Sequence, residues 1–466
     1  MRRSTTTVLG LAALALSAVP AAAGTDAPAD ATRPTGNDRY ETAAMLAAEA
    51  YEGETPETVL IASGEKFPDG LASSYLTGVL DAPILLVEAD LPIPQATFDA
   101  IDALGSTKAI IAGGPDTVSE AVEDKLVEEL GAGNVERIEG DDRIETASLL
   151  ASAGEGDVGT MADQSGDTTE ELRTAIVAHA GNFPDALAVG ALAFHGKYPL
   201  LLTDTDELSD LTKFALEDDT LDIEQVLIAG GPNSVSTDVE AEIADLANIQ
   251  NVHRVAGEGR TDTAADIAFL AQTTQGWDGT VTTLTTGENF PDALALAPLA
   301  ARMDASILLT PNKESVGGAT FASLQRVCAQ STSLIVASGP DWVPDEVVDQ
   351  ALMATECADE TIALAPENET GGGQSGASGM AWFWYDTFCY AYTVEGLTSP
   401  IVGAHIHEAP AGEDGDVVAP LDNGTFVMGC IDDDELNQQI QDDPSAFYVN
   451  VHTEEYPAGA VRGQFS

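Results

Sequence analysis

The feature that most constrains this chain is a set of short motifs that occurs three times in the same order. Each copy has an arginine motif, an apolar segment ending near a glycine, the tripeptide Phe-Pro-Asp, and later an apolar segment followed by a glycine-proline motif. The arginine motifs are DRYETA at 38–43, DRIETA at 142–147 and GRTDTA at 259–264; Phe-Pro-Asp lies at 67–69, 183–185 and 290–292; the last motif is GGP at 113–115 and 230–232 and SGP at 338–340. Such self-similarity indicates tandem structural modules.

The pattern within each copy predicts the fold of a module. Apolar segments of four to six residues alternate with helical segments, and uniformly apolar strands are typical of a parallel sheet covered by helices on both faces. We therefore predict three α/β modules of three layers with mainly parallel sheets, over 33–134, 135–250 and 251–357. The arginine and the aspartate are 30 positions apart in the first copy, 32 in the third and 42 in the second, so we expect a surface loop inserted at 154–167.

With all three motifs in register, residues 33–356 resemble the cell-wall-binding repeat type 2 family of bacterial surface proteins. In that family three modules form one pseudo-threefold unit that attaches the protein non-covalently to an anionic wall polymer. The resemblance implies the same arrangement and the same role here. The third copy departs from the family pattern, because Gly259 stands in place of an acidic residue and Ser338 replaces the first paired glycine.

The repeated arginines allow two interpretations. Arg39, Arg143 and Arg260 recur at one repeat position in a chain with only 18 basic residues against 78 acidic ones. The favoured interpretation is structural, an ion pair with the Phe-Pro-Asp aspartate of the same module. The alternative is that each guanidinium forks onto a phosphate or carboxylate of the polymer.

The other repeated residues are predicted to have structural roles. The aspartates at the ends of the Phe-Pro-Asp motifs are expected to cap helices by accepting from free backbone amides, with catalysis as the alternative. The paired glycines at the strand ends are expected to allow tight turns and to favour an anion at a helix N-terminus. Gly-Gly-Pro lacks the full phosphate-loop pattern, which argues against nucleotide binding. These residues are Asp69, Asp185, Asp292, Gly113, Gly114, Gly230 and Gly231.

Beyond residue 357 the pattern changes to aromatic, alternating segments with glycine-rich turns, which predicts an all-β antiparallel sandwich or barrel over 358–466. GAHIHE at 403–408 and YVNVHT at 448–453 resemble the signature segments of the chordin-type (CHRD) domain. The residues of these two segments that carry chemistry are three histidines.

His405 and His407 point to the same face of a strand, because successive side chains alternate. His452 on another strand would complete a three-nitrogen site for zinc or copper. The favoured interpretation is that the three histidines hydrogen-bond loop carbonyls inside the sandwich, and the metal site is the alternative.

The N-terminal residues are typical of a secretory signal peptide, with Arg2 and Arg3 before a short apolar run and small residues up to Ala23. We predict cleavage after Ala23, giving a signal peptide over 1–23 and a linker over 24–32; the alternative is an uncleaved N-terminal anchor. No later segment of the sequence has an apolar run of the length that a membrane span requires.

The net charge of −60, or −62 once Arg2 and Arg3 leave with the signal, predicts that the chain repels nucleic acid and anionic lipid. Binding to an anionic polymer then requires high salt, bridging divalent cations or a local basic patch. The even spread of acidic residues with little lysine suits a salt-rich environment. No cofactor is required by the pattern, apart from the divalent cation and the zinc or copper ion of these two alternatives.

The four cysteines are expected to pair, because the chain is predicted to be exported. Of the three pairings, Cys328–Cys357 with Cys389–Cys430 is favoured, since each pair then lies within one proposed domain.

These observations favour a secreted protein of the cell surface that binds cell-wall glycopolymer and displays its C-terminal domain. The alternatives are an envelope hydrolase, since wall-binding repeats often accompany amidases, and metal-dependent redox activity in the C-terminal domain. The sequence contains no zinc-protease helix motif, Gly-x-Ser-x-Gly elbow or Cys–His pairing, which argues against a hydrolase. The oligomeric state is left open.

Overall fold

The computed structural model describes residues 29–66, 68–165 and 170–466, which form two compact units. The first unit contains the three modules, residues 29–316 and 326–355; the second contains residues 356–466, with which residues 317–325 are grouped. The predicted signal peptide lies outside the described residues. None of the helices within these ranges combines the length and the apolar character needed to cross a membrane.

Each module contains a sheet in which four strands run parallel in the same spatial order, which confirms the predicted fold class. The central strands are buried on both faces, as a sheet between two helical layers requires. The orders are β3 (Ile84–Val87), β2 (Thr58–Ser63), β4 (Lys108–Ala112) and β5 (Val135–Ile138); β8 (Leu200–Thr203), β7 (Glu171–His179), β9 (Gln225–Ala229) and β10 (Asn251–Val255); β12 (Ile307–Thr310), β11 (Val281–Thr286), β13 (Ser333–Val336) and β1 (Asp30–Thr32).

The fourth strand of the third sheet comes from the N-terminal end of the described chain. In the first two modules the fourth strand, β5 or β10, leads directly into the first helix of the next module. The third sheet takes β1 instead, with Ala31 opposite Leu334, and β1 leads into the first helix of the first module. Residues 30–32 are therefore a strand of the third module, which corrects the prediction of a linker over 24–32. The three modules form a ring that is closed by this strand.

The helices begin where the repeated motifs lie. Asp38 and Asp142 cap the helices that start at the repeated arginines, since each side chain accepts from the backbone amides two and three residues on. Gly259 in the third module provides no such cap. The helices of the first unit are α1 (Arg39–Ala50), α2 (Pro68–Leu71), α3 (Ser73–Leu80), α4 (Gln95–Leu104), α5 (Glu120–Leu130), α6 (Arg143–Ala153), α7 (Pro184–Ala188), α8 (Gly190–Gly196), α9 (Asp210–Leu216), α10 (Thr237–Ala244), α11 (Arg260–Thr274), α12 (Pro291–Arg302) and α14 (Asp345–Thr355), with α13 (Gly318–Val327) at the junction of the grouping above.

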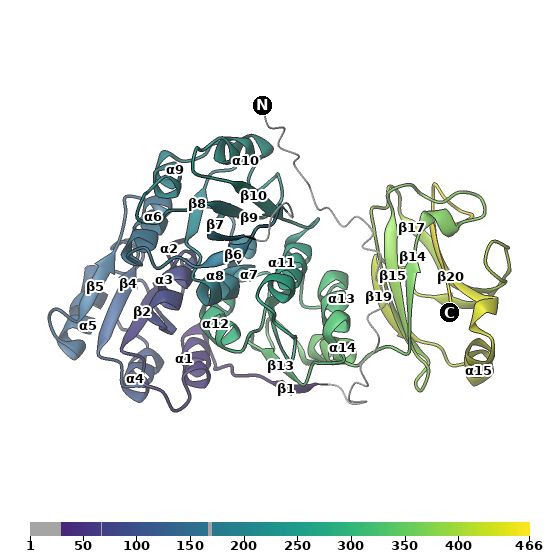
Figure 1. Cartoon of the computed structure of the whole chain (residues 1–466). Coiled ribbons are helices and arrows are strands. Elements are labelled where there is room, and N and C mark those ends of the chain that lie inside the picture. Colours follow the sequence, from purple (N-terminus) through teal and green to yellow (C-terminus); the bar gives the residue numbers. More distant parts are fainter. Residues whose placement is uncertain (1–28, 67, 166–169) are drawn as a thin grey trace. The chain divides into compact units, whose positions relative to one another are not determined.

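Three helices rich in small residues pack together where the modules meet. Helix α8 of the second module contacts both α3 of the first and α12 of the third, and α12 also contacts α1 (Figure 1). A side chain at Gly78 in α3 would collide with the backbone carbonyl of Phe194 in α8, so glycine is required for this close approach. One continuous apolar core includes Leu71, Leu192 and Leu296 from the three modules, and the ring is therefore a single packed body.

The insertion in the second module contains a strand. β6 (Thr160–Ala162) pairs antiparallel with the start of β7, where Thr160 lies opposite Arg173. The sequence predicted only a surface loop at 154–167, and this prediction needs correction. β7 has nine residues, and its first residues, Glu171 to Arg173, pair with β6. The loop prediction did not consider that this strand could begin so early.

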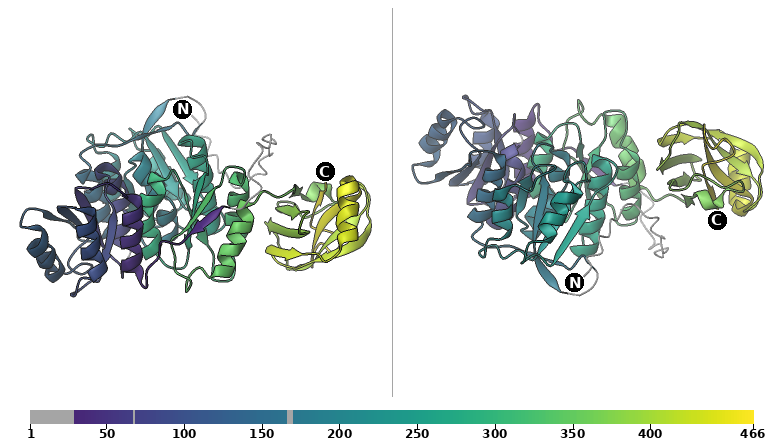
Figure 2. Two further views of the ribbon diagram at one scale, coloured as in Figure 1. Left: turned by 90° about the horizontal axis from the view of Figure 1, so that it is seen from below. Right: turned by 90° about the horizontal axis from the view of Figure 1, so that it is seen from above.

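The second unit is an antiparallel sandwich, as predicted, and two views show it in Figure 2. The inner faces of its two sheets share a core that includes Phe383, Tyr392, Ile406 and Val449. One sheet has the order β14 (Glu360–Leu364), β15 (Ser378–Trp384), β16 (Cys389–Glu395) and β19 (Phe426–Cys430); the other has β18 (Asp416–Leu421), β17 (Ile401–Glu408), β20 (Phe447–Thr453) and β21 (Val461–Gln464), and α15 (Asp434–Asp442) precedes β20.

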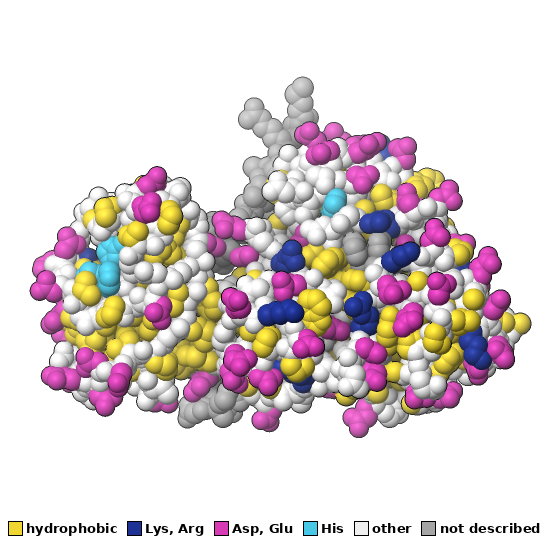
Figure 3. Space-filling view, turned by 180° about the vertical axis from the view of Figure 1, so that it is seen from behind, with side chains coloured by type: hydrophobic (Ala, Val, Ile, Leu, Met, Phe, Trp, Pro, Cys, Tyr) yellow, Lys and Arg dark blue, Asp and Glu magenta, His cyan; other side chains and the backbone are white. Residues whose placement is uncertain are grey.

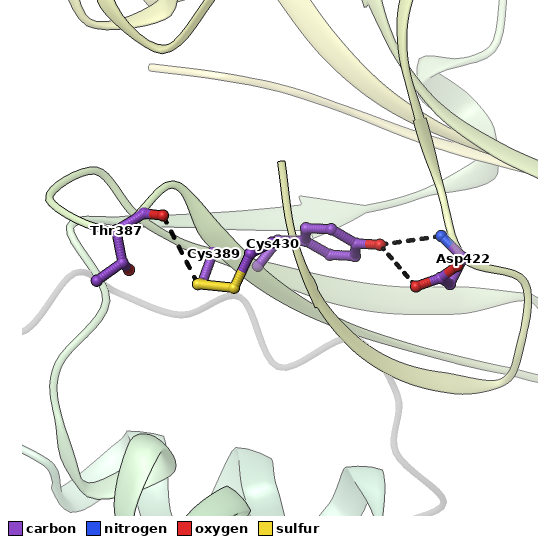
Figure 4. The surroundings of a disulfide bond; sticks show 5 residues. Thr387, Cys389, Asp422 and Cys430 are labelled. Carbon is purple, nitrogen blue, oxygen red and sulfur yellow. Dashed lines mark hydrogen bonds between the residues drawn. A yellow bond between two sulfur atoms is a disulfide. The ribbon is translucent and has the colours of Figure 1, made fainter. Parts of the chain in front are cut away.

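A disulfide joins Cys389 and Cys430, which lie directly opposite each other on β16 and β19 (Figure 4). This confirms the predicted pair. Cys328 and Cys357 are also disulfide-bonded, so none of the four cysteines, all of them in the described ranges, is free. Close by, the hydroxyl of Tyr390 accepts a hydrogen bond of 2.9 Å from the backbone N–H of Asp422 and connects β16 to the turn after β18.

Candidate functional site

The repeated arginines reach from the start of a helix to the carboxyl end of a central strand in their own module. Arg39 donates to the carbonyl of Gly64, Arg143 donates to that of Ala180 at 2.9 Å, and Arg260 donates to that of Gly287. The predicted ion pair within a module stays a prediction, and the bond that the structure shows for each arginine is to a backbone carbonyl of its own module. Each guanidinium has five N–H donors, and this bond uses one of them.

The aspartates of the Phe-Pro-Asp motifs do not cap helices in the described structure. Helices α7 and α12 have Phe183 and Phe290 at the capping position, without a side-chain bond. Each aspartate lies one residue inside its helix and accepts from a hydroxyl near the end of the third strand of the module. The pairs are Thr117 to Asp69 at 2.7 Å, Ser234 to Asp185 at 3.1 Å and Ser338 to Asp292 at 3.0 Å. The capping prediction is wrong because it considered only local backbone amides.

These aspartates also face an arginine of the next module around the ring. Burial raises the pKa of each carboxyl group, and for Asp292 to about 6. The hydroxyl hydrogen bonds lower these pKa values, and so does the positive charge of a neighbouring arginine. That arginine is Arg143 for Asp69, Arg260 for Asp185 and Arg39 for Asp292. The charge contacts thus run from module one to two, two to three and three back to one.

The glycine-proline motifs provide space for these aspartates. Gly113 and Gly230 have positive φ angles of 105° and 113°, and a Cβ at either position would collide with the carboxylate of Asp69 or Asp185. The next residues, Gly114 and Gly231, accept backbone hydrogen bonds that close the following turn. The first glycine is therefore required by a buried carboxylate, which is a structural role.

The third module replaces both partners of its aspartate. Ser338 occupies the position of the first glycine, has no positive φ, and donates its own hydroxyl to Asp292. Trp342 occupies the position at which Thr117 and Ser234 supply the hydroxyl in the other modules. The departure at Ser338 therefore preserves the hydrogen bond that the change to Trp342 would otherwise remove.

A second set of arginines, six residues before the first, was missed by the sequence analysis. Each donates to the carbonyl of the residue that begins the glycine-proline motif and contacts a carboxylate on the following helix. Arg137 bonds Gly113 at 2.6 Å and Glu123 at 2.8 Å, Arg254 bonds Gly230 at 2.6 Å and Glu240 at 2.8 Å, and Arg33 bonds Ser338 at 3.2 Å and Asp345 at 3.2 Å. The signal that could have found them is the spacing of six between two arginines in every copy.

The motifs of different modules meet at the carboxyl ends of the central strands. The rings of Phe183 and Phe290, from the second and third modules, have centroids 6.3 Å apart. Arg260 is exposed and Arg39 and Arg143 are partly exposed. Figure 3 shows a face of the first unit on which Lys and Arg side chains gather near the middle, although acidic side chains predominate over the surface. The ring therefore has arginine donors near solvent where its modules join.

In the second unit, the structure brings the three predicted histidines together. His405 and His407 lie on β17 and His452 lies on β20, with ring centroids 5.1 to 5.7 Å apart. The predicted hydrogen bonds to loop carbonyls are confirmed for His407 and His452. Burial and the neighbouring histidines lower the pKa of His452 to about 4.

Both units of the chain match families of known proteins. Residues 33–123, 137–240 and 254–348 match the family described as Cell wall binding domain 2 (CWB2), and residues 361–465 match the CHRD domain.

Two curated relatives come from Bacillus subtilis (strain 168). "Amidase enhancer" is 31% identical over 275 residues, which are 59% of this chain and 34% of the relative. "N-acetylmuramoyl-L-alanine amidase LytC" is 26% identical over 284 residues, 61% of this chain and 51% of the relative. The chain thus spans between a third and about half of the length of these relatives.

Solved structures with the same fold come from Clostridium difficile. Cwp6 has a TM-score of 0.60 and 24% identity over 71% of this chain and 48% of its own. Cwp8 has a TM-score of 0.58 and 27% identity over 70% of this chain and 51% of its own.

Proposed function

Because this chain belongs to the Cell wall binding domain 2 (CWB2) family and continues into a CHRD domain, we propose that its three modules attach it non-covalently to an anionic cell-wall polymer. The CHRD domain is then displayed at the cell surface. The observation that carries this proposal is the closed ring, in which each module places the same arginine beside the aspartate of the preceding module. One rigid body then presents three related arginines to a single polymer, and multivalent contact of this kind strengthens binding.

The guanidinium groups of these arginines are proposed to contact phosphate or carboxylate groups of the polymer. A guanidinium matches the geometry of phosphate and carboxylate, and one charge-assisted hydrogen bond contributes about 1.5–3 kcal/mol. Arg260 is the best candidate, because it is the exposed member of the three. Its contact with the carbonyl of Gly287 holds the side chain in place for such an interaction.

A chain with a net charge of −60 needs help to approach an anionic polymer. We propose that divalent cations bridge the acidic surface and the polymer, while salt screens the remaining repulsion. If bridging contributes, excess chelator will release part of the bound protein from walls at constant ionic strength. Undiminished retention in chelator would exclude bridging and leave the arginines and screening as the source of affinity.

The main test is co-sedimentation of the full chain with purified cell walls of its own source at native salinity, with soluble wall polymer as competitor. We expect the wild type to pellet and free polymer to release it. Arg260→Gln should weaken binding about 10-fold or more, which corresponds to the loss of one charge-assisted bond. Lys125→Gln, which removes a partly exposed cation on α5, is the matched control and should bind like the wild type.

The outcomes of this experiment separate two levels of the proposal. A wild-type protein that stays in the supernatant under all these conditions overturns wall attachment. Equal binding of Arg260→Gln and Lys125→Gln keeps attachment and overturns the role of Arg260.

Binding rather than catalysis is proposed for the first unit, because its repeated aspartates accept hydrogen bonds from hydroxyl groups within their modules, and Asp185 and Asp292 are buried. The names of the two relatives keep the alternative of a role in wall hydrolysis open to test. Incubating the protein with labelled peptidoglycan measures this directly. Release of soluble fragments by the purified chain would replace the proposal of a non-catalytic protein.

A further inference from the structure

One sheet of the second unit carries polar side chains on the face opposite the core. On β17 and β20, Ala404, Ile406, Val449 and Val451 belong to the apolar core of the sandwich. The alternating residues of the same strands therefore point to the other face. These residues, with one from β21 in register, are His405, His407, Tyr448, Asn450, His452 and Arg462.

Although it lies outside the apolar core, most of this polar face is buried, and His405 is its partly exposed member. His407 is 8% exposed and His452 9%, while Arg462 is 1% exposed. Loops supply the cover, since the carbonyls of Gly415 and Pro457 contact the two histidines. A buried polar surface is costly unless its donors and acceptors are satisfied.

The histidine nitrogens are satisfied on one side only. Nδ1 of His407 lies 3.0 Å from the carbonyl of Gly415, and Nδ1 of His452 lies 3.2 Å from that of Pro457. A carbonyl accepts only, so each Nδ1 carries the proton and each Nε2 presents a lone pair in the neutral ring. Among the described residues, neither Nε2 has a hydrogen-bond partner, and the same is true of Nδ1 of His405.

The three imidazoles are close enough to share one ion. Their candidate ligand atoms lie within 4.8 Å of one another. A point within about 2.8 Å of all three therefore exists, so side-chain movements of under about 1 Å would give the bond length of roughly 2.0–2.1 Å that zinc forms with imidazole. Gly403, two residues before His405 on the same face, leaves room for its ring, because a Cβ there would lie 2.8 Å from Cε1.

We propose that His405, His407 and His452 form a binding site for one divalent transition-metal ion of the zinc and copper class. Three imidazole donors suit these ions, whereas calcium and magnesium prefer oxygen ligands. The carbonyls of Gly415 and Pro457 act as the outer partners that orient two of the ligands, an arrangement typical of metal-bound histidines.

The site has an open fourth position next to a polar wall. Asn450 lies opposite His405 in the strand register, and Arg462 lies opposite Asn450. Oδ1 of Asn450 is buried and has no hydrogen-bond partner among the residues described, whereas Nη1 of Arg462 makes an ion pair of 3.7 Å with Asp414. Three protein ligands leave a coordination position for water or a small anion, as in zinc sites that exchange ligands. This inference does not depend on wall attachment by the first unit.

The test uses the full chain, expressed without a histidine tag and purified without chelator. Zinc and copper are measured by elemental analysis after dialysis against high salt with excess magnesium, which removes ions held loosely by the acidic surface. Titration of the metal-free protein with Zn²⁺ and with Cu²⁺ then gives the stoichiometry and the affinity. We expect one ion per chain and at least 100-fold weaker binding by His452→Gln. His179→Gln, a histidine of the first unit, is the control and should bind like the wild type.

A spectroscopic measurement keeps the test independent of the variants, in case His452→Gln folds poorly. Electron paramagnetic resonance of the wild type with one equivalent of Cu²⁺ should show coupling to imidazole nitrogens. Absence of a retained or tightly titrated ion, equal affinity of His452→Gln and wild type, or a copper spectrum without nitrogen coupling would each overturn the site.

Discussion

Asp292 provides a direct test of how the modules are held together, because its burial and its partners can be turned into a pH-dependent free energy. The side chain is 7% exposed, accepts a bond of 3.0 Å from Ser338, and faces the charge of Arg39 from the first module. Burial raises its pKa from 3.8 to about 6 in spite of these partners. The perturbation we propose is Asp292→Asn, which keeps the shape and the acceptor oxygen but does not ionise.

The size of the effect follows from this pKa shift. A rise of about two pKa units corresponds to about 3 kcal/mol. Because the folded protein binds the proton more tightly than the unfolded chain, Asp292 contributes this stability in full below its unfolded pKa of 3.8. The contribution is lost as the pH rises through about 6. The unfolding free energy of the wild type, minus that of Asp292→Asn, should therefore fall by about 2.4 kcal/mol between pH 4 and pH 7, because part of the effect lies below pH 4.

The assay is urea denaturation followed by tryptophan fluorescence from pH 4 to pH 8 at constant ionic strength. Subtracting the variant from the wild type cancels the titration of the many other carboxylates. Asp349→Asn, an exposed position on α14, is the control, and its difference should stay flat. A pH-independent difference for Asp292→Asn would show that its carboxylate is not desolvated in the folded protein. The conclusion that burial of Asp292 outweighs its contacts with Ser338 and Arg39 would then be refuted.

Three further predictions concern the ring and its surface. Ser338→Gly should lower the unfolding free energy by about 1–3 kcal/mol, because Asp292 loses its hydroxyl partner. Adding Trp342→Thr should recover part of this loss, which a double-mutant cycle measured by chemical denaturation would reveal. Arg254→Gln should cost about 3–5 kcal/mol in the same assay, since it leaves the carboxylate of Glu240 buried without its 2.8 Å partner; a loss below 1 kcal/mol would mean that this pair is not essential. The melting temperature should rise from low to molar sodium chloride, because screening relieves the repulsion in a chain of net charge −60, and a melting temperature indifferent to salt would contradict the proposed adaptation to high salt.

The module fold could be predicted from the sequence because its information is local and repeated. Strands such as Thr58–Ser63 have an apolar centre and are buried along their length, and three copies in register identified the motifs. β1 could not be predicted, because three residues carry no measurable pattern and their partner Ser333–Val336 lies about 300 positions away. Its place follows from ring closure, which is a property of the whole unit.

The site residues were found from the sequence more readily than their partners. Recurrence identified Arg39 and Asp292, but their charge contact joins the first and third modules, and no spacing within one copy indicates it. In the second unit, the spacing of His405 and His407 predicted that they share a face. The convergence of His452 on the same point depends on the register between β17 and β20, which only the structure supplies.

The origin of β1 has a consequence for how such a chain matures. The strand precedes all three modules in the sequence, yet the edge that it covers is made only after the third module has been synthesised. Pairing of β1 with β13 must therefore come late in folding. Until then β13 presents an uncovered edge, to which another chain can add a strand. Two molecules that exchange their β1 strands would satisfy the same pairings as one molecule alone, so a low protein concentration during folding favours the monomer over a swapped pair.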